Sequence, residues 1–303
     1  MDTTTIFIKD YNHDDVSRLL ESFDNVNLVL KSDGRHVKSA QHKNMMFYLG
    51  DDYLKVTGSL NKLVNDTNQF NFQLADVSEA IDYLSNLLDL DVGEAKVTRL
   101  DLGYNISLNQ PVSNYLMQLS HSYYSKRHSV ANETVEFRKH NRSLVFYDKM
   151  AELIAKKVEI ASEFKNQNLL RYEIRLMSRL TKILNQSSLS LNMLKEAPIQ
   201  KKLLRLWADE YLSVHKIYRP TANIDCRNTK TFVSSLASHG IKSIGGIETV
   251  VQHIDNVPDL AHTKRYRLYR KLRSINMVAA DEPSRCLLDE LSDKIQYIAA
   301  NAA

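Results

Sequence analysis

The stretch Arg142-Ser-Leu-Val-Phe-Tyr-Asp-Lys-Met-Ala-Glu152 changes its periodicity halfway along its length. In the first half, apolar Leu144 and Phe146 face one way and Tyr147 the other, which predicts a β-strand. In the second half the apolar residues, among them Leu153, follow helical spacing. Tyr147 is therefore expected where a strand passes into a helix, shortly before a lysine and a glutamate.

Three other segments, 97–106, 134–140 and 169–177, show the same alternation of apolar and polar residues. Segments with helical spacing of their apolar residues, such as 77–90, lie between these alternating segments along the chain. Strands with one apolar and one polar face, separated by helices, predict an α+β fold: an antiparallel sheet with helices on one face. The polar faces carry Arg99, Asp101, Gly103, Asn105, Glu136, Arg138, Arg171, Glu173 and Arg175.

Beyond about residue 180 the strand signals stop and helical stripes follow. We therefore expect two domains, 1–185 with the sheet and 186–303 as a mainly helical, basic region. Residues 201–275 contain 14 Lys and Arg against 6 Asp and Glu, a net charge of +8, although the whole chain carries only +4. Such local basicity favours an anionic partner, although a solvated helical surface would have the same composition.

The composition of the chain excludes several classes of protein. Its 303 residues contain no apolar run of about 18 residues, so no membrane span is expected. The two cysteines, Cys226 and Cys286, fit no zinc or redox spacing, and the start of the chain lacks a signal peptide, which favours a cytoplasmic setting. No phosphate-binding loop of the Gly-x-x-x-x-Gly-Lys-Ser/Thr type is present, so an ATPase is not expected.

The polar faces also carry residues suited to phosphate chemistry. Asp101 and Glu173 each lie in mid-strand with arginines two positions away. Carboxylates on adjacent strands can bind Mg²⁺ or Mn²⁺, arginines bind phosphate, and a tyrosine can act as a nucleophile. These parts suit an enzyme that transfers DNA strands through a phosphotyrosine. A merely solvated sheet face stays open as an alternative.

Three stretches in a fixed order resemble a known family: Val97–Asp101, Arg142–Glu152 and Leu170–Arg175. Gly58–Lys62 and the basic segment Lys264–Arg273 look similar as well. The family comprises the replication initiators of filamentous phages and related plasmids, the gene II/X family, which are rolling-circle nickases. The chain departs from the wider nickase pattern because it has no His-hydrophobic-His pair, and its histidines 121, 128 and 140 are isolated in sequence.

The resemblance implies a role for each site residue. Tyr147 would be the nucleophile, and Lys149 would contact phosphate or ease the ionisation of Tyr147, as would the nearby arginines. Asp101 and Glu173 would bind the Mg²⁺ or Mn²⁺ ion, with Glu152 as a third candidate. The residues expected to contact DNA are Arg99, Arg171, Arg175, Lys264, Arg265, Arg267, Arg270, Lys271 and Arg273.

The implied activity is metal-dependent nicking and strand transfer at a rolling-circle origin, on a single-stranded or hairpin site. A host helicase and a host polymerase would be partners, and a homodimer is left open. A non-catalytic origin-binding protein or repressor on the same scaffold is the alternative. Tyr123 and Tyr124 are the reserve candidates for the nucleophile, and 232–254 is a candidate helix-turn-helix.

Overall fold

The structure, a computed structural model, describes residues 2–30, 32, 34, 36–72, 74–217, 229–278 and 282–301. The chain forms two compact units, one of Met1–His215 with Leu291–Ala303 and the other of Lys216–Glu290. Among the described residues, no helix combines the length and the apolar character that a membrane crossing requires. The expected boundary at residue 185, between a catalytic and a DNA-binding region, stays a prediction. In the structure, residues 186–215 belong to the same compact unit as the sheet.

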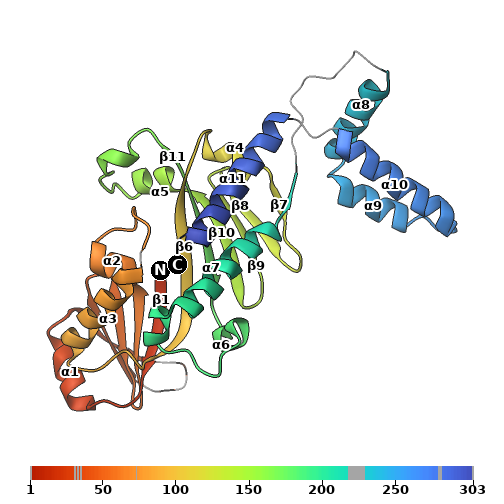
Figure 1. The fold of residues 1–303 in the computed structure, drawn as a ribbon. Coiled ribbons are helices and arrows are strands. Elements are labelled where there is room, and N and C mark those ends of the chain that lie inside the picture. The colour runs from red at the N-terminus through yellow and green to blue at the C-terminus, as the bar shows by residue number, and fades with distance from the viewer. Residues whose placement is uncertain are drawn as a thin grey trace. The chain divides into compact units, whose positions relative to one another are not determined.

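A ten-stranded antiparallel sheet organises the first unit (Figure 1). The α+β class predicted from the alternating segments is confirmed. The central strands are those that carry the polar residues singled out above. In spatial order the strands are β2 (Asp24–Leu30), β3 (His36–His42), β4 (Met45–Leu49), β5 (Leu54–Ser59), β1 (Thr3–Ile8), β6 (Lys96–Leu108), β11 (Asn168–Leu176), β10 (Arg142–Asp148), β9 (Thr134–Arg138) and β8 (Lys126–Val130).

The apolar face of the central strands packs on helix α7 (Ala197–Leu212) through a stack of aromatic rings. Trp207 is fully buried, and its ring lies 4.8 Å from that of Tyr172 and 5.2 Å from that of Tyr104. Phe146 stacks on Tyr172 at 4.3 Å with nearly parallel rings. Hydrogen bonds tie the helix to β11, because the Trp207 indole donates to the Tyr172 carbonyl and the Tyr172 hydroxyl donates to the Trp207 carbonyl. This stack fixes the orientation of the opposite, polar face.

The remaining helices of the first unit are short, apart from α3 and α11. The last part of α11 reaches α7, where the Tyr211 and Ser292 hydroxyls lie 3.1 Å apart. These elements are α1 (His13–Glu21), α2 (Leu60–Asn65), α3 (Leu74–Leu88), α4 (Val112–Leu116), α5 (Lys149–Ala155), α6 (Leu180–Leu184), the 3₁₀ turns Ser162–Phe164 and Asn192–Lys195, the paired strands β7 (Leu119–His121) and β12 (His215–Lys216), and α11 (Glu282–Asn301).

The predicted passage from strand to helix is confirmed at the end of β10. Asp148 is the N-cap of α5, and its carboxylate accepts hydrogen bonds from the backbone N–H groups of Met150 and Ala151 at 2.9 and 3.0 Å. An aspartate here satisfies two of the free N–H groups at the start of a helix. The short helix ends at Ala155, and Lys157 then has a φ of +54°. Tyr147 is thereby held on a strand, one residue before the cap.

The described residues of the second unit include the helices α8 (Thr229–Ser243), α9 (Ile247–Asp255) and α10 (His262–Val278) and the first part of α11, as far as Glu290. Gly245 and Gly246, with φ of +101° and +96°, make the tight connection between α8 and α9, a conformation that favours glycine. The predicted helix pair is therefore present. Whether it reads DNA as a helix-turn-helix stays a prediction.

Candidate active site

Cross-strand neighbours on the polar face form three parallel rows. Residues directly opposite each other in antiparallel strands point to the same side of the sheet, so each row is a line of adjacent side chains. We call them the tyrosine, glutamate and arginine rows. The tyrosine row is Asn105, Arg171, Tyr147, Thr134 and Val130; the glutamate row is Gly103, Glu173, Val145, Glu136 and His128; the arginine row is Asp101, Arg175, Ser143, Arg138 and Lys126.

Glu173 lies at the centre of the rows and joins Tyr147 to two arginines. The Tyr147 hydroxyl donates to Glu173 Oε1 at 2.8 Å, and Arg171 Nε donates to the same oxygen at 3.0 Å. The other oxygen, Oε2, accepts from Arg175 Nε at 3.1 Å and from Nη2 at 2.9 Å. Tyr147 and Glu173, to which the family resemblance assigns the roles of nucleophile and metal ligand, are therefore in direct contact.

The environment of Tyr147 keeps its phenol neutral. Burial raises the pKa of Tyr147 well above its ordinary value of 10, and the negative charge of Glu173 raises it further. Arg171 acts in the opposite direction but does not compensate. Arg171 thus eases the ionisation of Tyr147, as expected, but burial and Glu173 outweigh it, and the sequence did not predict that balance. The reason is that a sequence shows charges but does not show how far a group is removed from water.

Arg171 lies inside the protein, although it was predicted to contact DNA. Its side chain is only 1% exposed, and its three nitrogens are all engaged. Nε binds Glu173, Nη1 donates to Asn105 Oδ1 at 2.7 Å, and Nη2 donates to the carboxylate of Asp2. These carboxylates hold the pKa of Arg171 above its usual value despite its burial. Contact with phosphate would require Arg171 to change partners.

Asp2 is a member of the site that the sequence did not reveal. Asp2 is 7% exposed. Its backbone N–H donates to the Asp101 carbonyl at 2.8 Å, which continues the pairing of β1 with β6 beyond the start of β1. Burial opposes its ionisation, yet Arg171 holds the pKa of Asp2 below its ordinary value, so the carboxylate is charged. Oδ1 accepts no hydrogen bond within the described part of the chain. A single acidic residue ahead of a strand carries no periodic signal.

Gly103 makes room for this cluster on β6. A Cβ atom at Gly103 would lie 2.7 Å from Glu173 Cγ, 2.8 Å from Asp2 Oδ2 and 3.1 Å from Arg171 Nη2. Real Cβ contacts are longer than this, so three buried side chains can converge only because the position has no side chain of its own.

Gly103→Ala is therefore expected to lower the free energy of unfolding by about 1–3 kcal/mol, because the methyl group must displace buried charged groups. Urea denaturation followed by tryptophan fluorescence measures this change. Gly240→Ala is the matched control, since nothing lies within 4 Å of a Cβ atom there and the residue is in helix α8. Equal stability of the Gly103→Ala variant and the wild type would contradict the crowding.

Lys149 and Glu152 form a second buried pair at the start of α5. Lys149 is fully buried, and its Nζ donates to Asn68 Oδ1 at 2.8 Å and to Glu152 Oε2 at 2.6 Å. Burial lowers the pKa of Lys149, although Glu152 acts against this. Glu152 also binds Lys156. Burial alone would raise the pKa of Glu152, but the two lysines bring it below its usual value. Both residues thus have protein partners.

Asp101 is paired with Arg99, two residues away on the same strand. Arg99 Nε lies 3.1 Å from Asp101 Oδ1, and Nη2 lies 2.7 Å from Oδ2. Burial raises the pKa of Asp101 despite this arginine. The carboxylates of Asp101 and Glu173 offer the hard oxygen atoms that Mg²⁺ and Mn²⁺ prefer. Within the described residues, however, they do not join Glu152 in a group whose ligand atoms lie within 4.8 Å of one another.

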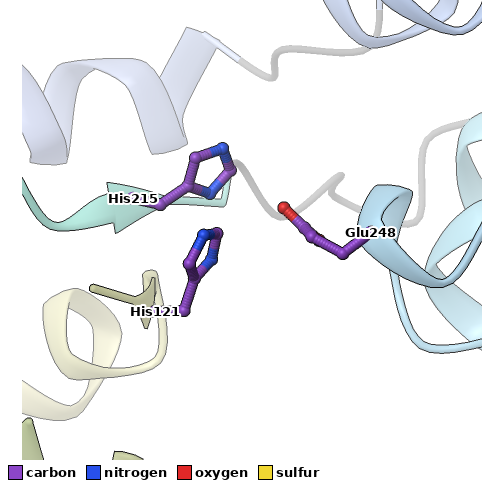
Figure 2. A group of neighbouring side chains, drawn as sticks. All are labelled: His121, His215 and Glu248. Atoms are coloured by element: carbon purple, nitrogen blue, oxygen red, sulfur yellow. The ribbon is translucent and has the colours of Figure 1, made fainter. Parts of the chain in front are cut away.

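His121 is isolated from other histidines in the sequence, but its ring has a histidine neighbour in the structure. The ring stacks on that of His215, with ring centres 4.6 Å apart and planes 26° apart (Figure 2). The two residues come from the paired strands β7 and β12. Glu248, drawn in the same figure, belongs to the second unit. His121 and His215 are too far apart along the chain for a local motif search to pair them.

The basic residues predicted on 264–273 lie on helix α10. Lys264, Arg267, Arg270 and Lys271 are exposed, whereas Arg265 is half-buried with its Nε 4.0 Å from Asp255 Oδ1. The side chain of Arg273 lies outside the described residues. A helix with this many exposed cations can lie along a phosphate backbone, so the expected DNA contact stays a prediction for α10.

A comparison with protein families finds a family model whose match covers the strands that form the three rows. The family model, which describes the N-terminal part of a phage replication-associated protein, the gene II protein, matches residues 12–211. The match contains Asp101, Tyr147 and Glu173 and ends before the basic helix α10. No curated protein matches the chain.

Proposed function

The chain belongs to the family of phage replication-associated proteins that includes the filamentous phage gene II replication initiator, and we propose that it nicks and rejoins DNA at a rolling-circle origin. Membership makes it a replication initiator and implies that it binds origin DNA. The proposal adds the chemistry: transfer of a DNA strand to Tyr147 through a phosphotyrosine. A host helicase would then unwind the nicked strand, and a host polymerase would extend its 3′ end along the intact strand.

One observation supports the proposal most directly, the 2.8 Å hydrogen bond from the Tyr147 hydroxyl to Glu173 Oε1. Burial and Glu173 keep the phenol neutral, so its proton has to leave as the oxygen attacks. Glu173 is already placed to accept that proton, which is the geometry required of a general base. The polar side chains of an inert sheet surface are solvated, whereas Glu173 is a buried carboxylate that contacts a tyrosine and two arginines.

The proposed step is an in-line displacement at phosphorus. The Tyr147 oxygen forms a bond to the phosphorus of the nicked phosphodiester, and its proton passes to Glu173 Oε1. The bond from phosphorus to the 3′ oxygen breaks, and that oxygen takes a proton from water to leave a free 3′-OH. The 5′ phosphate stays on Tyr147. In the joining step a 3′-OH attacks the phosphotyrosine and gives its proton to water. The bond from phosphorus to the Tyr147 oxygen breaks, and that oxygen takes back the proton held by Glu173.

Asp101 and Glu173 would hold a divalent ion, Mg²⁺ or Mn²⁺. When bound, such an ion polarises the phosphoryl group and stabilises the charge that develops on it. The carboxylates are now paired with Arg99 and Arg175, whose side chains are 38% and 34% exposed. These arginines can turn from the carboxylates toward a phosphate. Glu173 Oε2 and the Asp101 oxygens then become available, while Glu173 Oε1 stays on Tyr147.

The test uses supercoiled plasmid that carries the origin, with Mg²⁺ or Mn²⁺ and, separately, with EDTA. We expect nicked circles with protein attached at the 5′ end, and loss of nicking by at least about 100-fold in EDTA. Asp101→Asn should lose nicking to a similar degree. Glu21→Gln, which removes an exposed carboxylate paired with Lys38, is the matched control and should nick normally.

Two outcomes separate the possibilities. Full nicking in EDTA would contradict the metal proposal and leave the tyrosine chemistry intact. Tight binding of the origin with no nicking under any metal would favour the alternative, a non-catalytic origin-binding protein or repressor.

A further inference from the structure

The arginine row continues past the catalytic strands to the edge of the sheet. Arg175 lies opposite Ser143, Ser143 opposite Arg138, and Arg138 opposite Lys126 on the edge strand β8. Arg99 joins the row through its hydrogen bonds to Asp101. Neighbouring strands are about 4.8 Å apart, so cationic side chains follow one line across the strands for about 20 Å.

The cationic side chains of the arginine row reach solvent, in contrast to Arg171 in the tyrosine row. The exposed fraction of Arg138 is 60%, and Lys126 is exposed, whereas Arg171 in the tyrosine row is 1% exposed. The positive charge of the polar face is therefore presented along the arginine row. The hydroxyl that is proposed to attack DNA lies only two rows away.

Three of these arginines are held by a carboxylate two residues away on the same strand. The pairs are Arg99 with Asp101, Arg175 with Glu173, and Arg138 with Glu136, the last at 2.8 Å between Nε and Oε2. In each pair the carboxylate is the more buried partner. The carboxylates thus keep the guanidinium groups on the polar face, from which they can turn toward a phosphate.

Two exposed tyrosines precede β8, next to the Lys126 end of the row. Tyr123 is 68% exposed and Tyr124 is 99% exposed. Tyr124 has a φ of +56°, a conformation that a bulky residue adopts rarely. The ring of Tyr124 is not buried in the described fold, so burial of the ring does not offset the strain of this backbone conformation. Exposed aromatic rings beside cationic groups are typical of surfaces on which unpaired bases stack.

We propose that the arginine row and the two tyrosines form a track for single-stranded DNA. The strand runs across the sheet, with phosphates on Arg99, Arg175, Arg138 and Lys126 and bases on Tyr123 and Tyr124. The track deepens the proposed nicking function and rests on it, because it leads an unpaired strand past Glu173 to Tyr147. Duplex DNA does not fit, since its base faces are stacked on each other and cannot reach the tyrosines.

The test measures binding of the full chain to a fluorescent oligo-dT of about 15 nucleotides over a series of salt concentrations. The double variant Lys126→Gln/Arg138→Gln should bind more weakly. The slope of log K against log salt should fall by about 1.4, the value for two phosphates on a single strand. Tyr124→Ala should weaken binding about fivefold or more and leave the slope unchanged, because stacking releases no counterions.

Matched control variants remove similar groups elsewhere. Arg18→Gln/Lys195→Gln removes two exposed cations, and Tyr297→Ala removes a tyrosine that is 70% exposed on α11. Both controls should bind oligo-dT as the wild type does.

The outcomes separate the track from the nicking reaction. Unchanged affinity and slope in the arginine-row variant would overturn the track even if the wild type nicks its origin. Weaker binding by that variant, together with a wild type that never nicks, would support the track and overturn the proposed nickase. Preference for a duplex hairpin or for an oligo-U RNA over oligo-dT would also overturn it.

Discussion

Tyr147→Phe is expected to lower origin nicking by roughly 10⁴-fold or more and to abolish the covalent adduct between protein and DNA. The substitution removes only the hydroxyl, whose hydrogen bond to Glu173 is 2.8 Å long. A phenylalanine ring fills the same space beside the cap of α5. The variant should therefore fold and bind oligo-dT as the wild type does, and lose the chemistry alone.

The position of the adduct provides the sharper measurement. Digestion of the wild-type complex and mass spectrometry should find the phosphate on the peptide that contains Tyr147. Tyr297→Phe serves as the control, since it removes an exposed hydroxyl from α11. An adduct on Tyr123 or Tyr124, or an adduct that persists in Tyr147→Phe, would show that the nucleophile has been assigned wrongly.

Arg171→Met is expected to lower the free energy of unfolding by about 3–5 kcal/mol, the usual cost of removing one partner from a buried ion pair. Arg171 is 1% exposed and binds two carboxylates, Asp2 and Glu173. Methionine has a similar length but leaves these negative charges buried without a counter-charge. The single tryptophan, Trp207, is fully buried and gives a fluorescence signal for urea denaturation. Arg138→Met, on an exposed arginine paired in the same way, should cost no measurable stability.

The difference in stability between wild type and Arg171→Met should shrink as the pH falls. In the wild type the pKa of Asp2 lies below 3.8, so its pairing contributes stability that is fully present above that value and is lost in more acidic solution. Without Arg171, burial dominates and raises the pKa of Asp2. Protonation of Asp2 in the variant then relieves the buried charge as the pH falls from neutral toward 3.8, the ordinary value for an aspartate. A difference that stays constant over this range would mean that Asp2 is not the group responsible.

Much of the central site could be predicted because strand periodicity is a local property. The alternation around Asp101, Tyr147 and Glu173 placed all three on polar faces, and the change of period after Tyr147 located the capped start of α5. Tyr104 and Tyr172 lie on the apolar faces of the same alternating segments, and both are buried in the core. Each inference needed only residues a few positions apart.

The pairing of strands could not be predicted in this way. Nothing local shows that Arg175 lies opposite Asp101, or that Arg171 turns inward to Asp2. The edge strand β8 escaped notice because all of its residues are exposed, so it has no apolar face to alternate with a polar one. The raised pKa of Tyr147 likewise depends on burial, which arises only when distant segments cover it.

The aromatic stack behind the site determines how fast its parts can move. Phe146, Tyr172 and Trp207 bind the interior strands β10 and β11 to α7, so the amide hydrogens of these strands should exchange only when the unit unfolds globally. Edge strands such as β2 and β8 can open locally. In the proposed reaction, entry of DNA therefore needs only rotation of partly exposed side chains such as Arg99 and Arg175, on the scale of nanoseconds. Separation of the strands that carry Tyr147 and Glu173 would be far slower.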